Sequence, residues 1–539
     1  MKNVSKAAVA ALTVAVAGLT VGTAGADAIK KVTQPLEDKL EWGACPPQPE
    51  GAPALDPRQL CATMNVPLNY QVPNGRQIEL TVSKISTAHP DKRRGTLLLN
   101  PGGPGASGLD LPSMFAKLLP EEVKQQYDLI GFDPRGVGYS TPLTCGLGPA
   151  DLDPTKVIPW PEAGGDITEN VEFAKNVADQ CAEESADLMP NVTTANTARD
   201  MDQIRSMLGE DKISYLGYSY GTYLGAVYAT LFPQQTDRFV LDSAVDPTKV
   251  WREVWNSWGP AVQQRFPNFL QFVANNDDTY HLGQTPAEVR TVFEDLTEQL
   301  NKAPLELPGG DLLDGNTFRE ATRGVLYSND SFAQGAQMWS DISSATTQQL
   351  TGELQQRLSE VTSLFSDVPA DSGVATLQAI TCNDAPWNTT VREHAAQVQQ
   401  SLKQFPLTQG MPANVWSCAF WPKNAVQQPV DISSQGPANI LIPQSLRDPA
   451  TPHLGAENML GELGQRARML TSQTGGHGVY RLAHNACADL ATTRFLTTGQ
   501  LPDASMVCKA TGNPAQALRQ LSPQQQQVVR ELRSRMLPL

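Results

Sequence analysis

The sequence lacks several features on which large classes of protein depend. Its 41 Lys and Arg residues are outnumbered by 56 Asp and Glu, which gives a formal net charge of −15. Without clustered basic residues to neutralise phosphates, neither nucleic acid nor an anionic membrane surface is expected as a partner. No CxxC spacing occurs and the six histidines are scattered, so a metal site is not expected. No organic cofactor is expected either.

A strongly apolar run of the roughly 20 residues that span a membrane is also missing. The apolar stretch near the N-terminus is short and alanine-rich, with Lys2 and Lys6 before it and small residues after it. This layout predicts a signal peptide over 1–28, cleaved near Ala26 or Ala28. We therefore expect a secreted protein that contacts a membrane only before cleavage, with association with the cell wall as the alternative to full release.

The sequence has only eight cysteines, which is an even number. An even count in an exported chain predicts disulfides, although the sequence alone leaves the connectivity open. Pairing between sequence neighbours would close four short loops, and a catalytic cysteine is then not expected. The expected pairs are Cys45 with Cys61, Cys145 with Cys181, Cys382 with Cys418, and Cys487 with Cys508.

The chain is long enough for one enlarged domain or for two domains of about 100 to 200 residues each. Short aliphatic runs alternate with helical patterns before residue 250, and strand patterns return after residue 437. This alternation predicts an α/β fold with a mostly parallel sheet. The expected strands are Ile78–Ile85, Gly95–Leu99, Tyr127–Phe132, Ile213–Leu216, Arg238–Leu241, Ala438–Pro443 and Ala467–Thr471.

The middle of the chain has a different character. Gln-rich amphipathic stretches such as Ala287–Leu300 and Gln348–Phe365 replace the strand signals there. Because strand patterns resume afterwards, the segment predicts a helical cap insertion at 251–430 within one sheet. The remaining residues, 29–250 and 431–539, are then the N-terminal and C-terminal parts of one core.

A G-x-S-x-G sequence occupies residues 217–221, directly after the expected strand at Ile213–Leu216 and before a helix rich in small residues. Such a turn is so tight that only glycine fits at its flanks, and it leaves the central serine exposed above a helix N-terminus. We therefore expect Ser219 to be a nucleophile. The alternative is an ordinary turn serine.

A nucleophilic serine needs a base, which in hydrolases of this type follows the serine and the acid in chain order. His477 lies in a Gly-Gly-His-Gly loop just after a late expected strand, where the loop can bring an imidazole to the serine. His453 lies too close behind the expected acid, and His484 falls in what is expected to be the next helix. His477 is therefore the expected base.

The acid that orients the base is expected after the strand that precedes the histidine loop. Asp448 has this position, 29 residues before His477. Asp242 and Asp246 follow the previous expected strand and are the alternatives. The ordinary role of such an aspartate is a turn or helix cap. Asp448 is favoured because of its place relative to the histidine.

The stretch 99–108 contains the run Asn-Pro-Gly-Gly-Pro-Gly and ends an early strand. A loop of this kind supplies backbone donors to the oxyanion in acyl transfer. We expect the N–H of Gly103 as one donor, with Gly102 as the alternative, and the N–H of Tyr220 as the other. Since no Gly-Lys-Ser/Thr follows, a phosphate-binding loop is not expected.

The next strand end carries charged residues that could be mistaken for catalytic groups. Asp133 and Arg135 lie two residues apart in an Asp-Pro-Arg-Gly sequence. Such residues more often pin a loop than react, so we expect them to form a structural salt bridge.

Taken together, NPGGPGASG, GFDPRGVGYS, YLGYSYGTYLGAVYATLFP, SLRDPATP and GGHG resemble the proline-iminopeptidase-like branch of the α/β-hydrolases, and within it the secreted tripeptidyl aminopeptidases of actinobacteria. The resemblance runs from about Trp42 to Cys508. It implies triad roles for Ser219, Asp448 and His477 and a cap that closes the substrate cleft. Asn100 stands where proline iminopeptidases usually carry histidine, which favours the relatives that act on longer peptides.

An exopeptidase must recognise the free α-amino group of its substrate, and a carboxylate would bind that group by a charge-assisted hydrogen bond. Asp384, within the expected cap, is a candidate, and a helix cap is its alternative role. The expected function is therefore that of a secreted, monomeric serine exopeptidase that releases short peptides, expected to be tripeptides. The alternatives are a secreted carboxylesterase that acts on small esters and a non-catalytic envelope binding protein with a hydrolase fold.

Overall fold

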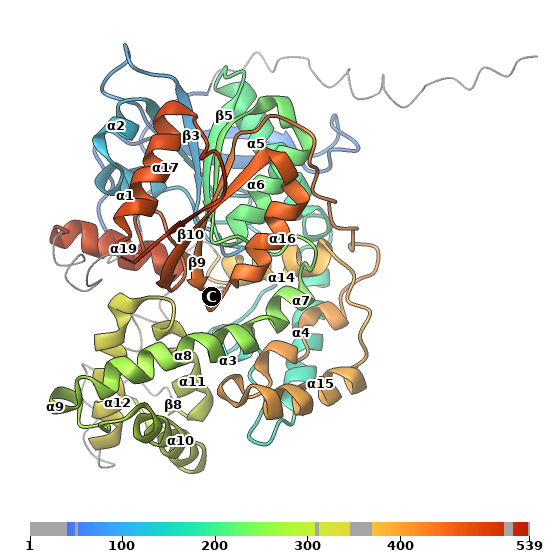
Figure 1. Cartoon of the computed structure of the whole chain (residues 1–539). Helices are drawn as coiled ribbons and strands as arrows, with labels where there is room; N and C mark the ends of the chain where they lie inside the picture. Colours follow the sequence, from blue (N-terminus) through green and yellow to red (C-terminus); the bar gives the residue numbers. More distant parts are fainter. Residues whose placement is uncertain (1–39, 49–51, 308–311, 345–368, 511–520, 537–539) are drawn as a thin grey trace, which may run out of the picture. The chain divides into compact units, whose positions relative to one another are not determined.

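The computed structural model of the protein describes residues 40–48, 52–307, 312–344, 369–510 and 521–536 (Figure 1). The expected signal peptide at 1–28 and the amphipathic stretch at 348–365 lie outside the described residues.

A mostly parallel sheet forms the centre of the fold. Its nine described strands have the order β1-β2-β4-β3-β5-β6-β9-β10-β11. The β1–β2 and β2–β4 pairs are antiparallel and the other pairs are parallel, which confirms the predicted fold class. The strands are β1 (Leu60–Pro67), β2 (Gln77–Ile85), β3 (Gly95–Asn100), β4 (Tyr127–Phe132), β5 (Ile213–Tyr218), β6 (Thr236–Asp242), β9 (Ile440–Arg447), β10 (Ala467–Gly475) and β11 (Met506–Cys508).

Helices cover both faces of this sheet, and for that reason every residue of β3, β4 and β5 is buried. One face is covered by α1 (Leu111–Leu118), α17 (Ala486–Thr498) and α19 (Pro523–Met536), and the other by α5 (Thr194–Met207), α6 (Tyr220–Leu231) and α16 (His453–Leu463) (Figure 1).

The chain between β6 and β9 forms a helical insertion, drawn below the sheet in Figure 1. We call its described residues within 251–430 the cap. The cap has a core of its own, in which Phe266, Phe269 and Phe293 pack around Trp339. Its helices are α7 (Arg252–Asn256), α8 (Trp258–Ala274), α9 (Asp277–Tyr280), α10 (Pro286–Lys302), α11 (Gly315–Val325), α12 (Phe332–Ser344), α14 (Ser372–Asn383) and α15 (Val391–Gln404), with a small hairpin of β7 (Leu305–Glu306) and β8 (Leu312–Leu313).

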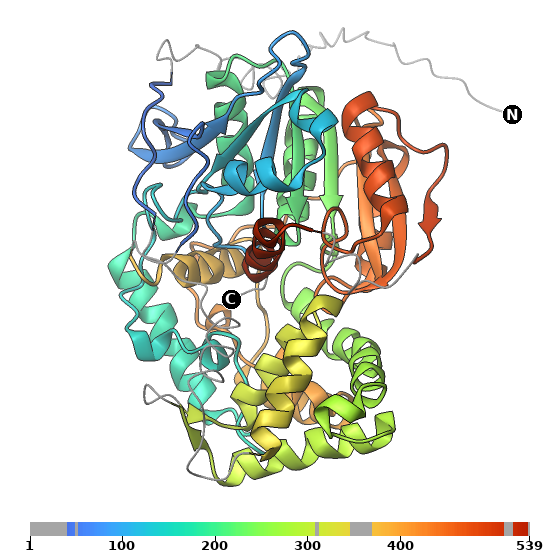
Figure 2. The ribbon, with the colours of Figure 1, turned by 90° about the vertical axis from the view of Figure 1, so that its left-hand side faces the viewer.

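A second segment, from between β4 and β5, packs on the cap, although the sequence pattern assigns it to the core. It contains α3 (Pro154–Val157) and α4 (Thr168–Glu184), which contact α11 and the short turn at Ser417–Ala419 (Figure 2). Its Trp160 donates an indole hydrogen bond of 2.9 Å to the buried Glu320 of α11. The cap layer is therefore built from two separate parts of the chain.

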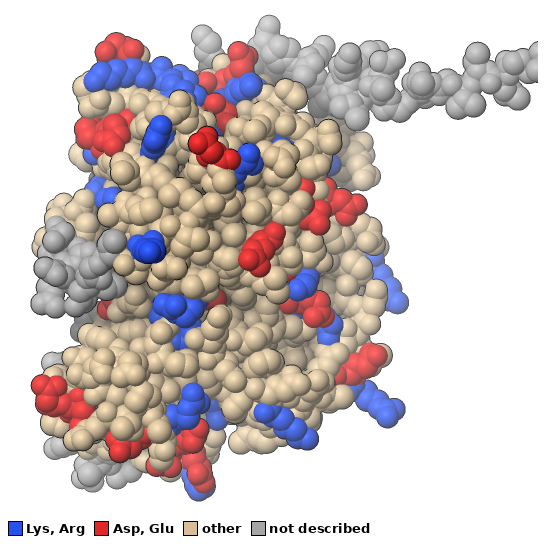
Figure 3. Space-filling model, in the orientation of Figure 1, with Lys and Arg blue, Asp and Glu red and all other residues tan. Residues whose placement is uncertain are grey.

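Disulfides join all four of the pairs expected from sequence proximity: Cys45–Cys61, Cys145–Cys181, Cys382–Cys418 and Cys487–Cys508. Such cross-links are typical of proteins outside a reducing cytosol. A search of the described residues finds no helix that combines the length and the apolar character of a membrane span. On the face shown in Figure 3, acidic and basic side chains are interspersed.

Asp133 and Arg135 are both buried and structural, but the expected salt bridge between them is not formed. Arg135 pairs instead with Asp200 of α5, through contacts of 2.6 and 2.7 Å. Asp133 accepts hydrogen bonds from the hydroxyl of Ser107 and the N–H of Gly108. Asp133 therefore fixes the loop that follows β3, while Arg135 fixes α5.

Candidate active site

The residues expected to react lie at the carboxyl ends of three strands of the sheet. Ser219 follows β5, Asp448 follows β9 and His477 lies in the loop after β10. This edge of the sheet is where ligands bind in open α/β folds. The sequence-predicted triad residues therefore lie at one edge of the sheet.

Ser219 is the single residue between a strand and a helix, since β5 ends at Tyr218 and α6 begins at Tyr220. Its φ of 54° and ψ of −124° are unusual for a residue with a side chain, and such strain is found at functional sites. A Cβ atom at Gly217 would lie 2.7 Å from the carbonyl oxygen of Gly221. The turn therefore requires glycine at this flank.

Asp448 holds His477 in a fixed orientation. Nδ1–H of His477 donates to the Asp448 carboxylate, with 2.8 Å to Oδ2 and 3.0 Å to Oδ1. Oδ1 also accepts the N–H groups of Ala450 and Thr451, each at 2.9 Å, and the Thr451 hydroxyl donates to Oδ2 at 3.1 Å. A carboxylate on Nδ1 leaves Nε2 as the acceptor that a general base needs.

Two polar atoms of this site have no hydrogen-bond partner in the described part of the chain. Nε2 of His477 is the buried one, and Oγ of Ser219, a residue that is 6 % exposed, takes part in none of the hydrogen bonds between described residues. A buried polar atom without a partner calls for an explanation, and a catalytic role is one. Hydrogen bonds between a nucleophile and its base are often long without substrate and tighten when substrate binds.

The loop after β3 lies against the nucleophile. A Cβ atom at Gly102 would lie 2.9 Å from the Cβ of Ser219, so only glycine allows this approach. The N–H of Gly102 donates to Oδ1 of Asn100 at 3.0 Å. The N–H groups of Gly103 and Tyr220 have no acceptor among the described residues. Of the three predicted donors, Gly103 and Tyr220 are therefore the ones available to an oxyanion.

The carboxylates of Asp242 and Asp246, the alternative acids, bind groups other than the histidine ring. Asp242 accepts hydrogen bonds from the N–H groups of Val479 and Tyr480, and Asp246 accepts from Thr248 and Asn458. Neither carboxylate contacts Nδ1 of the histidine in the hydrogen bonds of the described residues. The geometry therefore favours Asp448 over both alternatives.

The cap contributes Tyr327, a residue that the sequence pattern does not single out. Its carbonyl oxygen accepts the N–H of His477 at 2.8 Å, and its ring meets the imidazole edge-on with 5.4 Å between centroids. Burial raises the pKa of Tyr327 to about 12, against the opposing effect of Arg323, which donates a 2.8 Å hydrogen bond to the phenol oxygen. Tyr327 carries no motif, because it becomes part of the site only through packing of the cap on the core.

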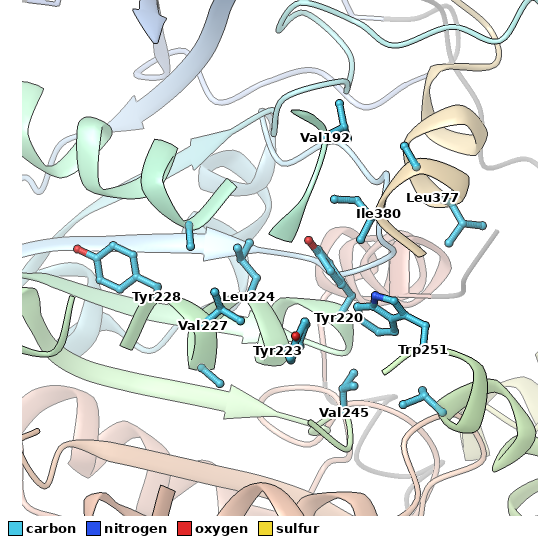
Figure 4. Close-up of a cluster of buried hydrophobic side chains, with 14 of the residues drawn as sticks. Val192, Tyr220, Tyr223, Leu224, Val227, Tyr228, Val245, Trp251, Leu377 and Ile380 are labelled. Atoms are coloured by element: carbon cyan, nitrogen blue, oxygen red, sulfur yellow. The ribbon is translucent and has the colours of Figure 1, made fainter. Parts of the chain in front are cut away.

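A small cavity adjoins Ser219 and the two free N–H groups. Most of its wall is apolar, and none of its lining residues carries a charge. Figure 4 shows one part of the wall, where Trp251 packs beside Tyr220 and Val245. The lining residues are Gly103, Ser219, Tyr220, Val245, Trp251, Val254, Trp255, Trp258, Ala450 and Thr451.

Asp384 is buried behind this wall and is not brought to Ser219. Its Oδ1 accepts the N–H of Thr194 at 2.9 Å, and its Oδ2 accepts the Thr194 hydroxyl at 2.6 Å and the indole N–H of Trp251 at 3.2 Å. Burial raises the pKa of Asp384 to about 6, while these hydrogen bonds lower it. In this structure the carboxylate therefore orients Trp251 and Thr194.

His453 and His484, the other two histidines near His477 in the sequence, contact residues outside the triad. His453 begins α16 and contacts Thr471 through its ring. His484 lies just before α17, contrary to the expectation that it falls inside a helix, and its Nε2 contacts Asp330 of the cap. Within the described ranges, no group of three or more His, Cys, Asp or Glu side chains is placed to hold a metal ion.

The sequence matches the model of the α/β hydrolase fold family over residues 95–480. A tripeptidyl aminopeptidase of Streptomyces lividans is 35 % identical over 467 residues, which cover 84 % of each chain. Serine protease Hip1 of Mycobacterium tuberculosis is 29 % identical over 496 residues, covering 88 % of this chain and 91 % of that protein. Carboxylesterase B of the same species is 28 % identical over 460 residues, covering 83 % and 86 %.

The chain belongs to the α/β-hydrolase fold family. Its resemblance to the tripeptidyl aminopeptidases, expected from short motifs, is confirmed across most of its length, and its relatives place it among the serine peptidases of the family.

Proposed function

We propose that the protein is a secreted, monomeric serine exopeptidase that releases short peptides, expected to be tripeptides, from the free N-terminus of a peptide. The observation that carries the proposal is the arrangement around His477, whose Nδ1 is bound by buried Asp448 while its Nε2 is unpaired. The relationship to a tripeptidyl aminopeptidase supports the choice of peptides, and the four disulfides support export.

In this mechanism Oγ of Ser219 attacks the scissile carbonyl as Nε2 of His477 takes its proton. Asp448 stabilises the imidazolium that forms, and the N–H groups of Gly103 and Tyr220 bind the oxyanion. The imidazolium then gives its proton to the leaving amine, which breaks the peptide bond and leaves an acyl-enzyme. Water, deprotonated by the same histidine, hydrolyses the ester and frees the serine.

The uncharged cavity beside Ser219 is expected to receive the side chain next to the scissile carbonyl. Burying a charge there without a partner would cost several kcal/mol. Among tripeptide anilides that differ only in the third residue, we expect kcat/KM for Asp or Lys to be roughly 100-fold or more below that for Ala or Leu. Steady-state kinetics on this series, with the same changes at the first residue as the control, measure the effect. Equal rates across the third position would contradict the assignment of the cavity.

The free amino group separates the exopeptidase from its alternatives. Because a charge-assisted hydrogen bond to the α-ammonium would be lost, N-acetylation of a tripeptide anilide is expected to lower kcat/KM roughly 10- to 100-fold. Unblocked dipeptide and tetrapeptide anilides, compared with the tripeptide, give the product length.

Equal rates on blocked and free tripeptides would exclude an exopeptidase. Hydrolysis of a short acyl ester without hydrolysis of any peptide would favour the carboxylesterase. Failure of folded protein to react with a fluorophosphonate at Ser219 would favour a binding protein that has kept only the fold.

A further inference from the structure

The loop that carries His477 has to cross two strands to reach the nucleophile. In the sheet, β6 and β9 separate β5, which leads to Ser219, from β10, which leads to His477. Neighbouring strands lie about 4.8 Å apart, so three steps separate the two strand ends by roughly 14 Å. Whether the imidazole reaches the serine therefore depends on where this loop is anchored.

The loop of His477 is anchored by hydrogen bonds to the end of β6. Asp242, the last residue of that strand, is fully buried, and its two carboxylate oxygens accept the N–H groups of Val479 at 2.8 Å and Tyr480 at 2.6 Å. The hydroxyl of Ser243 donates to Asp242 at 3.1 Å and accepts the N–H of Gly478 at 2.8 Å. Three consecutive N–H groups directly after the histidine are thus held by two adjacent side chains.

The same strand end also holds the nucleophile turn. The carbonyl oxygen of Asp242 accepts the N–H of Ser219 at 3.0 Å. Tyr218, which is opposite Asp242 in the pairing of β5 with β6, donates its hydroxyl to the carbonyl oxygen of Tyr480 at 3.0 Å. The turn before the serine and the loop after the histidine are therefore tied to each other and to Asp242.

From these contacts we infer that Asp242 is a positioning residue for catalysis, because its carbonyl oxygen fixes the turn of Ser219 while its carboxylate fixes the loop of His477. It acts through the backbone and does not contact the reacting atoms, in contrast to Asp448. The inference rests on the serine mechanism proposed above, but it holds for any acyl substrate.

The charge of Asp242 matters for this role, because an ionised carboxylate only accepts hydrogen bonds and all of its neighbours here donate. Burial raises the pKa of Asp242 to about 7, while its hydrogen bonds with Tyr480, Val479 and Ser243 and the charge of His477 lower it. The titratable groups that face it are His477 on the loop after β10 and Tyr218 on β5. Protonation turns one accepting oxygen into a donor and loosens the loop as the pH falls below about 7.

Asp242→Asn tests the inference, because the amide keeps the shape of the side chain but places an NH₂ group against a backbone N–H. We expect kcat, and the rate of fluorophosphonate reaction at Ser219, to fall about 100-fold, since a displacement of about 1 Å costs this much. KM should stay within about twofold. The acid limb of log kcat against pH should be shallower in the variant than in the wild type, because the side chain at position 242 no longer titrates.

Two further variants complete the test. Ser243→Ala removes the hydrogen bonds of this hydroxyl with Gly478 and Asp242 but leaves the Asp242 carboxylate in place, and it should lower kcat about 10-fold. Asp246→Asn is the matched control on the same segment, since its carboxylate faces Thr248 and Asn458, and it should leave kcat and its pH profile unchanged.

A wild-type kcat and pH profile in Asp242→Asn, with only a lower Tm, would overturn the inference. If that variant does not fold, an unchanged kcat in Ser243→Ala overturns it equally. The proposed function fails separately, if the wild type cleaves esters but not peptides. In that case the rate of fluorophosphonate labelling at Ser219, compared between the wild type and Asp242→Asn, still tests the role of Asp242.

Discussion

Replacement of Ser219 by alanine is expected to lower kcat by on the order of 10⁶-fold, because removal of the nucleophile from such a triad leaves only binding and the oxyanion donors. Ser219 has a φ of 54°, and alanine retains the Cβ atom that the turn already accommodates. The fold should therefore be unaffected. Hydrolysis of a free tripeptide anilide and covalent labelling by a fluorophosphonate measure the loss.

The control for this change is Ser83→Ala, which removes a buried hydroxyl bound to the carbonyl of Leu109 in a part of the sheet away from the nucleophile. It should retain full labelling. Labelling that persists in Ser219→Ala, at a peptide that contains another serine, would show that the nucleophile lies elsewhere.

Asp448→Asn is expected to lower kcat about 10⁴-fold with little change in stability, because the amide selects the wrong tautomer of His477. The N–H groups of Ala450 and Thr451 both donate to Oδ1, so the amide oxygen must occupy that site. The NH₂ group then takes the place of Oδ2, 2.8 Å from Nδ1. An NH₂ donor at that position requires Nδ1 to accept, which puts the proton on Nε2 and prevents it from taking the proton of Ser219.

The matched comparison is Asp242→Asn, which should cost about 100-fold and leave the tautomer unchanged. Steady-state kinetics and thermal unfolding of both variants on the same substrate separate the two roles. If Asp242→Asn were the more damaging by 100-fold or more, the acid of the triad would be Asp242, and the alternative weighed from the sequence would be correct.

Much of the core was predictable because its signals are local. Each predicted strand is present. The parallel strands among them were recognisable as aliphatic runs because helices cover both of their faces, whereas β2 pairs antiparallel with both of its neighbours. The turn at Ser219 was recognisable because a strand, two flanking glycines and a helix follow one another directly. The disulfides were predicted from sequence proximity, which succeeds when each pair closes a short loop.

What the sequence did not reveal depends on contacts between distant segments. The edge strand β1 mixes exposed and buried positions, and β11 has only three residues, so neither gives a clear pattern. Arg135 finds its partner 65 residues away in Asp200, and no local spacing indicates that choice. Asp384 was singled out for its chemistry, whereas the hydrogen bonds it makes follow from how α14 packs against Trp251.

Thr451 shows an intermediate case. Its place three residues after Asp448 is typical of a side chain that closes a turn on an aspartate, so its contact with the carboxylate could have been expected. Its second contact, at 3.3 Å from Nδ1 of His477, depends on where the histidine loop comes to rest. The contact of Thr451 with Asp448 could therefore be predicted from the sequence, whereas its contact with His477 could not.

The origin of the cap layer in two parts of the chain limits how it can move. The polypeptide leaves the sheet after β4 and after β6, and it returns before β5 and before β9, so four chain crossings join the two layers. An insertion with two crossings can swing about a single hinge, whereas four spaced attachments resist rotation about any one axis. We therefore expect that the cap layer does not swing as one rigid body about a single hinge when substrate enters.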